Sequence, residues 1–185
     1  SRELGMPGST VHRLVSTLEA LGYLRQNSDN ERYRLGIGAY ILGSRVKMLN
    51  ELSTIAKPYL AELSNRYNET SHLSITLGND RLLCIDKSKT NRGFFATPDV
   101  GGTHRIHITS SGKAMLAFMP EAEQDRIISQ IQFQRYTPNT IMTAEQLKEQ
   151  LQVIRREGIA IDNEESELGL FCCGAPIFDA EGKCF

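Results

Sequence analysis

The chain has 185 residues, of which 40% are apolar and 23% are charged, and it contains no Trp. This composition is that of an ordinary globular protein. It excludes a collagen-like, low-complexity or disordered chain, and no apolar run reaches the length of a transmembrane helix.

The formal net charge of −1 is unevenly distributed, because residues 1–50 carry +3 and residues 51–185 carry −4. A basic first quarter permits a polyanionic partner. The chain has neither an initiator Met nor an export signal, and it stops after a turn signal, so we expect both ends to be cut. The four cysteines lack CxxC spacing, which favours reduced thiols and a cytoplasmic protein.

The first predicted elements are a helix end, a turn and a second helix. Gly5 ends the first helix, Pro7 and Gly8 mark the turn, and Ser9 is the expected N-cap of the next helix. That helix carries an apolar stripe with α-helical spacing, which we expect to face the core: Val11, Leu14, Val15, Leu18 and Leu21. Gly22 supplies its end.

Two short strands at residues 23–26 and 32–35, joined by a polar turn, complete a winged helix-turn-helix over residues 1–36. Residues 37–50 are helix-periodic and are interpreted as a linker helix. A further amphipathic helix is predicted at residues 56–67, with Pro58 in its first turn.

After residue 70 the hydrophobic period changes to two, which predicts strands. The expected strands are residues 71–77, 82–87, 94–96, 104–108, 159–161 and 171–178. Strands mixed with helices without strict alternation indicate an α+β fold. We assign residues 51–185 to a second domain with an antiparallel sheet and flanking helices, and we expect its C-terminal part to be missing.

Three helices accompany these strands, at residues 111–119, 121–131 and 144–157. The last has the clearest boundaries, because Thr143 and Gln146 form a capping-box pattern and Gly158 follows its end.

The polar face of the helix that follows Ser9 is suited to DNA. Hydroxyl groups and the N–H groups of a helix N-terminus bind phosphate, while Arg and His side chains reach base edges. Such a face on an isolated helix is more often only solvated, but here a turn precedes it and an Arg-bearing hairpin follows. The candidate DNA-contacting residues are Ser9, Thr10, His12, Arg13, Thr17, Arg32 and Arg34.

Four blocks occur along the chain: MPGSTVHRLV at 6–15, YRLG at 33–36, SGKAMLA at 111–117, and DNEE at 162–165 followed by LGLF and APIFD. In this order they resemble the IclR family of bacterial transcriptional regulators. The resemblance implies a winged helix-turn-helix, here truncated, joined by a linker helix to a GAF-like effector domain.

The resemblance also implies a function. Such a protein binds operator double-stranded DNA as a homodimer or homotetramer and controls a catabolic operon, with repression as the expected mode, in response to a small organic or aromatic acid. By motif, the effector contacts would be Phe94, Ala96, His104, Ile106, Ser110, Ser111, Asp162 and Cys172.

Physical reasoning supports part of this pocket. The N–H groups of residues 110–112 precede a helix and suit a carboxylate, although Ser111 is equally interpretable as an ordinary N-cap. Asp162 follows an apolar segment and is expected to face the pocket. For Glu164 to Glu167 a solvated loop is favoured.

The alternatives are an enzyme and a binding module that does not contact DNA. A thiol or acid/base enzyme would use Cys172 with His104 or Asp162, but no nucleophile-elbow, phosphate-loop or metal motif is present. A metal site of His104, His107 and a cysteine is disfavoured, because H-x-x-H on a strand places the two rings on opposite faces. His72 is expected on the sheet surface. We therefore expect no catalytic residue, metal, cofactor or membrane contact.

Overall fold

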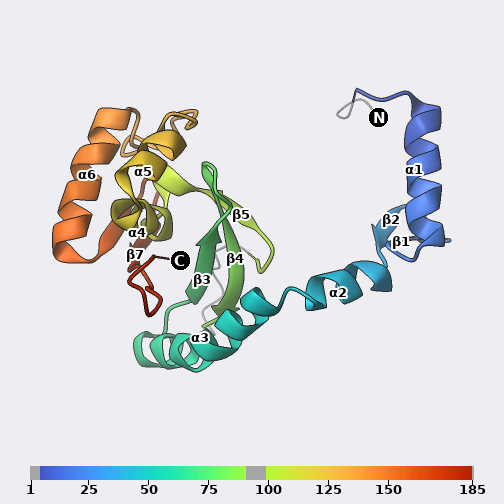
Figure 1. The fold of residues 1–185 in the computed structure, drawn as a ribbon, viewed down its shortest axis with the longest axis horizontal. Helices are drawn as coiled ribbons and strands as arrows, with labels where there is room; N and C mark the ends of the chain where they lie inside the picture. The colour runs from blue at the N-terminus through green and yellow to red at the C-terminus, as the bar shows by residue number, and fades with distance from the viewer. Residues whose placement is uncertain (1–4, 91–98, 185) are drawn as a thin grey trace. The chain divides into compact units, whose positions relative to one another are not determined.

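The computed structural model describes residues 5–90 and 99–184, and it divides the chain into two compact units, Ser1–Thr54 and Ile55–Phe185. Helices and antiparallel sheets together give the predicted α+β class (Figure 1). Among the described residues, no helix has both the length and the apolar character needed to cross a membrane. The helix end predicted at residues 1–5 falls largely outside the described residues, and the strand predicted at residues 94–96 does so entirely.

The first unit contains the predicted helix and hairpin. Helix α1 is Gly8–Ala20, and strands β1 (Leu24–Gln26) and β2 (Tyr33–Leu35) pair antiparallel. The prediction of Ser9 as N-cap is wrong, because the N-cap is Pro7. The carbonyl of Pro7 accepts the N–H groups of Thr10 and Val11 at 3.0 and 3.1 Å, so the first turn begins before Ser9 and includes it.

Close backbone contacts between glycines connect the hairpin to the helices of this unit. Gly22 ends α1 with φ of +75°, and its carbonyl accepts the N–H of Gly38 at 2.9 Å. A Cβ on Gly36 would lie 2.2 Å from the oxygen of Gly22. Only glycine therefore fits at position 36.

The apolar stripe of α1 does not form the core that its spacing predicts. Leu14 and Leu18 are 48% and 41% exposed, and no described residue between 5 and 54 is buried. The expectation fails because the described residues of this unit supply no second layer that covers the stripe.

The predicted linker helix of residues 37–50 is wrong as a single element. Helix α2 is Ile37–Ser44, and helix α3 is Lys47–Tyr67. The end of α2 tightens, since the N–H of Arg45 donates to Leu42 and that of Val46 donates to Gly43. Pro58 lies in the interior of the long α3 rather than in a first turn, and it removes one helical hydrogen bond there.

The second unit contains a three-stranded antiparallel sheet in the order β3-β4-β5, made of Ser71–Thr76, Arg81–Ser88 and Thr103–Arg105. The prediction of a strand at residues 104–108 is wrong after Arg105, where Ile106–Ile108 form a 3-10 turn, η1. All three side chains of this turn are buried. A strand would send the middle one to the opposite face.

A separate two-stranded sheet pairs β6 (Ala160–Asn163) with β7 (Phe171–Gly174). Strand β7 is shorter than predicted, and beyond it, within the described residues, an isolated bridge joins Phe178 to Cys184. Three helices complete the unit: α4 (Ser110–Phe118), α5 (Glu121–Ile128) and α6 (Ala144–Glu157).

The boundaries of α6 are the predicted ones. The hydroxyl of Thr143 accepts the N–H of Gln146 at 3.2 Å, and Gly158 takes the left-handed conformation with φ of +75°. By contrast, α5 ends three residues earlier than expected.

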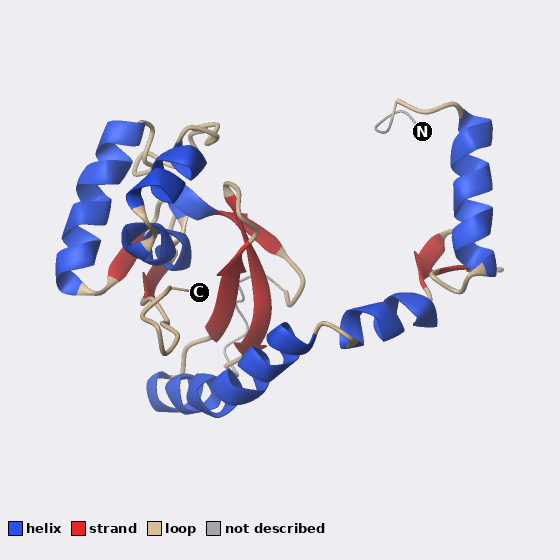
Figure 2. Ribbon diagram, viewed as in Figure 1, coloured by secondary structure: helices blue, strands red, loops and turns tan. Residues whose placement is uncertain are grey.

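Helix α4 lies at the centre of the buried core, where it contacts α6, η1 and strands β3, β6 and β7 (Figure 2). Ala114, Leu116 and Ala117 of this helix are completely buried. Residues of α3 are held to the strands by hydroxyl groups, since Ser71 donates to the carbonyl of Leu60 at 2.7 Å and Ser64 donates to that of Ser88 at 2.9 Å.

Candidate functional site

The polar face of α1 points to solvent. Ser9, His12, Arg13 and Thr17 are exposed, and Thr10 is half-buried. The hydroxyl of Thr17 donates to the carbonyl of Arg13 at 2.9 Å, which leaves its oxygen free to accept. The structure therefore presents the candidate DNA-contacting side chains of this helix together on one accessible surface.

The hairpin adds a basic edge to the same unit. Arg25 and Arg34 stand directly opposite each other in the β1–β2 register, and Arg32 precedes β2, with all three exposed. Asn30 accepts the N–H of Arg32 at 3.1 Å and shapes the turn. Like charges directly opposite each other on a hairpin repel, and an anion between them relieves the repulsion.

A small cavity of about 40 Å³ lies in the second unit. It is bounded by one face of the three-stranded sheet, by the start of α4 and by the β6–β7 hairpin, through His72, Ser74, Leu82, His104, Thr109, Ser110, Ser111, Asp162, Ser166, Leu170 and Cys172. This volume holds a water molecule or two, so it is far below the usual size of a site for a drug-sized ligand.

Five of the residues that the family resemblance implied for the pocket converge on this cavity: His104, Ser110, Ser111, Asp162 and Cys172. Ile106 does not. It is completely buried in the hydrophobic core, because η1 turns its side chain inward. Phe94 and Ala96 lie outside the described residues.

The start of α4 borders the cavity through Ser110 and Ser111. The N-cap is Thr109, not Ser111, since the Thr109 hydroxyl accepts the N–H of Gly112 at 3.3 Å. The N–H groups of Ser110 and Ser111 belong to the positive end of this helix and suit an anion. Gly174 of β7 packs against the same turn, where an added Cβ would lie 2.7 Å from the carbonyl carbon of Ser110.

Two histidines of the sheet face this helix start. His72 Nε2 lies 3.2 Å from the hydroxyl of Ser111, so the prediction that His72 is a sheet-surface residue is wrong. Burial lowers the pKa of His72, with His104 and Lys87 adding to the effect, and burial with Arg81 lowers the pKa of His104. Both rings are therefore neutral at pH 7, with one donor and one acceptor nitrogen each.

Among the described residues that line the cavity, Asp162 is the one that carries a carboxylate. It is only 1% exposed, and its two oxygens accept the N–H of Glu165 at 2.8 Å and the hydroxyl of Ser166 at 3.0 Å. Burial raises its pKa, although both hydrogen bonds and Lys113 act in the opposite direction.

Cys172 is the cross-strand partner of Asp162. Burial, together with the charge of Asp162, raises the pKa of the Cys172 thiol to about 11. A nucleophilic cysteine needs the reverse shift. The thiol at this position thus behaves as a small neutral side chain, which disfavours the thiol-enzyme alternative.

The acidic segment after β6 is not a solvated loop throughout. Glu165 is buried and forms an ion pair with the completely buried Lys113 of α4, so the expectation for Glu165 is wrong. Sequence reasoning missed both residues of this pair, as well as Ser74, Thr109 and Ser166 of the cavity. Lys113 occurs in the SGKAMLA block. The apolar residues that follow this lysine in the helix were the available sign that its side chain is buried.

His104 and His107, for which the sequence disfavours a shared metal site, lie in different surroundings. His104 lines the cavity, whereas His107 is buried in the core with its ring 5.1 Å from that of Phe133. Over residues 5–90 and 99–184, no three His, Cys, Asp or Glu side chains are grouped so that they could hold a metal ion.

Two protein families match the chain. "Bacterial transcriptional regulator IclR C-terminal" matches residues 46–185, and "IclR helix-turn-helix domain" matches residues 1–28.

Curated relatives are similar over nearly the whole chain. The regulator XynR of Escherichia coli K12 is 33% identical over 183 residues, which are 99% of this chain and 72% of XynR. KdgR of Dickeya chrysanthemi is 35% identical over 182 residues, which are 98% of this chain and 59% of KdgR.

Solved structures agree in fold. The Thermotoga maritima IclR crystal structure has a TM-score of 0.76 at 32% identity and covers 99% of this chain and 73% of that one. An IclR homolog of Microbacterium hydrocarbonoxydans, complexed with 4-hydroxybenzoate, has a TM-score of 0.88 at 23% identity, with 99% of this chain and 75% of that one covered.

Proposed function

The chain belongs to the IclR family of bacterial transcriptional regulators, and we propose that it represses a catabolic operon in response to a small organic or aromatic acid. In this proposal residues 1–36 bind operator DNA and residues 51–185 bind the effector. Residues 37–50 link these two regions of the chain. The protein acts in the cytoplasm, as a homodimer or homotetramer that reads two half-sites.

The observation that carries the proposal is the chemistry of the cavity. A helix start with two N–H groups, two neutral histidines and one hydrogen-bonded carboxylate face the same space. A carboxylate fits the start of α4, while a ligand hydroxyl fits His104 or Asp162. The combination suits a hydroxylated acid better than a neutral or cationic ligand.

The size of the cavity refines the proposal. At about 40 Å³ the cavity is smaller than either class of acid: a compact acid requires a small displacement of the walls, and a ring such as the 4-hydroxybenzoate bound by the Microbacterium protein requires a larger one. Native mass spectrometry of the purified chain, followed by calorimetry with lactate and 4-hydroxybenzoate, distinguishes these two classes. The absence of a co-purifying acid, together with no heat from either probe, would count against the effector site.

The DNA-binding part of the proposal has its own test. Arg13→Ala is expected to lower operator affinity by about 5- to 150-fold, because a base-contacting arginine contributes roughly 1–3 kcal/mol. Arg156→Ala is the matched control, since Arg156 is an exposed arginine of α6 in the second unit. A gel shift with the native promoter measures both. An unchanged affinity for Arg13→Ala would mean that α1 is not the reading helix.

Regulation requires that the effector bind the DNA-competent and DNA-incompetent states with unequal affinity. A regulator releases its effector unchanged. Recovery of the intact ligand after prolonged incubation therefore separates this function from the enzyme alternative.

A further inference from the structure

Lys113 has an unusual environment for a lysine. It lies on the central helix α4, completely buried, next to the equally buried Ala114. Its ammonium donates to the side-chain oxygen of Gln150 at 2.9 Å, to the carbonyl of Ile161 at 2.6 Å and to a carboxylate oxygen of Glu165. An ammonium has three N–H groups, so all of its donors are used.

Those three contacts join α4 to α6, to β6 and to the segment that follows β6. Glu165 is the critical partner, because its own backbone N–H donates to Asp162 at 2.8 Å. The next residue, Ser166, donates its hydroxyl to the second oxygen of Asp162. The position of residues 165 and 166 therefore determines how the Asp162 carboxylate is directed in the cavity.

Lys113 itself is not among the residues that line the cavity, whereas Asp162 and Ser166 are. A second anchor acts on the same segment, since the hydroxyl of Thr140 donates to the carbonyl of Glu165 at 2.8 Å. The segment is thus held by two residues, Lys113 and Thr140, that do not line the cavity.

Stability alone does not account for this arrangement. Replacing a buried ion pair by apolar side chains of similar volume is often neutral or stabilising, and the other buried residues of α4 include Ala114, Met115 and Leu116. The second carboxylate oxygen of Glu165 is also buried without a partner among the described residues. Such a site is arranged for one specific contact rather than for the largest gain in stability.

We infer that Lys113 is a positioning residue of the effector cavity: its ammonium holds Glu165, and through Glu165 it directs the Asp162 carboxylate and the Ser166 hydroxyl toward the ligand. The identification of the cavity as a ligand site rests on the proposed function. The anchoring of the segment does not.

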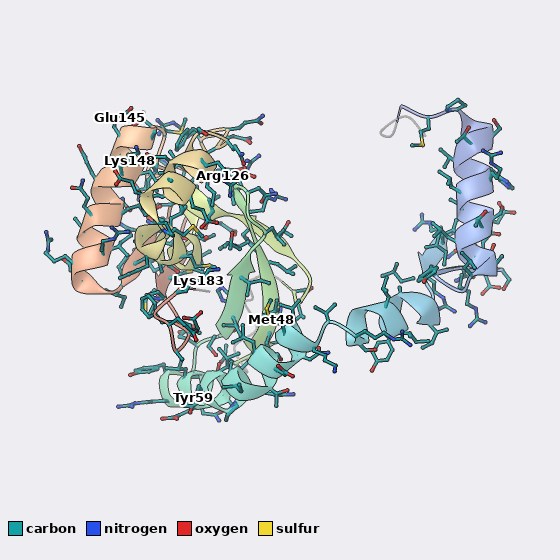
Figure 3. All side chains as sticks on the ribbon, in the orientation of Figure 1. Met48, Tyr59, Arg126, Glu145, Lys148 and Lys183 are labelled. Carbon is teal, nitrogen blue, oxygen red and sulfur yellow. The ribbon has the colours of Figure 1, made fainter. Side chains whose placement is uncertain are left out.

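Amide hydrogen exchange of the full chain, measured by NMR without ligand, tests the anchoring. In Lys113→Met, the N–H of Glu165 is expected to exchange about tenfold faster relative to the N–H of Leu151 in the core of α6, because only the anchored segment opens locally. A uniform acceleration, or none, would overturn the inference. The control is Lys148→Met, which removes a half-exposed lysine of α6 (Figure 3). Lys148 pairs with Asp125 at 2.6 Å, and its replacement is expected to leave the ratio unchanged.

A second pair of variants decides the question if Lys113→Met does not fold. Glu165→Gln retains an oxygen that accepts from Lys113, whereas Glu165→Ala does not. We expect near-native exchange at residue 165 in the first and exchange about tenfold faster in the second, again relative to Leu151. Equal behaviour of the two variants would overturn the inference.

Calorimetry with lactate and 4-hydroxybenzoate then connects the anchor to the ligand. Lys113→Met, or Glu165→Ala in its place, is expected to bind the better of the two probes about tenfold more weakly than the wild type. Faster exchange with unchanged affinity would overturn the positioning role. If neither probe binds the wild-type chain, the proposed function loses support, while the exchange ratios still decide the anchoring.

Discussion

The two units of the chain use their apolar side chains in opposite ways. In the second unit, Leu116, Ile127 and Leu147 are completely buried and form one continuous core with the rest of α4 and α6. In the first unit, Leu14 and Leu18 of α1 remain almost half exposed. None of the described residues from 5 to 54 is buried.

This difference separates the two tasks of a regulator. The second unit can surround a cavity because a rigid core holds the start of α4 and the β6–β7 hairpin against each other. The first unit is held by backbone contacts among Gly22, Gly36 and Gly38, and it presents its polar side chains outward. Mutations should therefore change stability mainly in the second unit and DNA affinity mainly in the first.

The largest expected effect compares one leucine of each unit. Leu116→Ala is expected to lower the free energy of unfolding by about 2–5 kcal/mol, because it leaves a cavity in a closed core. Leu14→Ala removes a side chain that is already about half in water, so a loss of only about 1 kcal/mol is expected. Urea denaturation followed by circular dichroism measures both, and equal losses would contradict the contrast between the units.

A pH effect is expected from the core histidine. Burial lowers the pKa of His107 to about 4, and neither ring nitrogen has a partner among the described residues. The unfolded chain, with an ordinary histidine pKa of about 6.5, binds more protons than the folded chain between those two values. Stability should therefore fall as the pH drops from about 6.5 to 4, by up to about 3 kcal/mol, and level off below that range.

His107→Leu is the variant that tests this pH effect. It is expected to flatten the fall without abolishing it, since His72 and His104 also have lowered pKa values. Urea midpoints at pH 7, 5.5 and 4.5 measure the slope. An identical slope in the variant would show that His107 is not the group responsible.

Two helical glycines give a smaller contrast. A Cβ on Gly112 of α4 would lie 2.0 Å from the carbonyl oxygen of Ile106, whereas a Cβ on Gly43 of α2 meets nothing within 4 Å. Gly112→Ala is expected to destabilise by about 1–3 kcal/mol, and Gly43→Ala to stabilise by roughly 0.5–1 kcal/mol. Thermal unfolding of both variants checks the signs, and stabilisation by Gly112→Ala would contradict the packing of η1 against α4.

The smallest expected effect lies in the hairpin. Arg34→Ala should weaken operator binding by a few-fold, because a phosphate contact contributes without reading sequence, and should reduce the slope of log affinity against log salt by about 1. Binding titrations at several salt concentrations measure this slope. A loss confined to one operator sequence would instead identify Arg34 as a base-contacting residue.

Local signals in the sequence predicted a large part of the fold. The capping box at Thr143 and Gln146 marks the start of α6 and Gly158 marks its end, because each signal acts within the helical turn next to it. The hairpins are likewise encoded by short turn segments. The family resemblance implied in advance that five of the cavity residues share a pocket, among them Ser110, Asp162 and Cys172.

Other features were beyond local signals. The alternation of apolar and polar residues predicts a strand through residues 104–108. It does not show that Ile106, His107 and Ile108 are all buried, which a strand does not allow. For His72, period two places the residue on a face of the strand but does not identify which face the start of α4 covers.

What the sequence alone determined is the class of the fold, most element boundaries and the family, since these depend on contacts within a few residues and on the order of the motifs. Tertiary structure alone decided that Leu14 stays exposed, that Ile106 lies in the core and not at the cavity, and that Lys113 is buried against Glu165. Burial and pairing over more than fifty residues of separation depend on how the elements pack, and no short stretch of sequence contains that information.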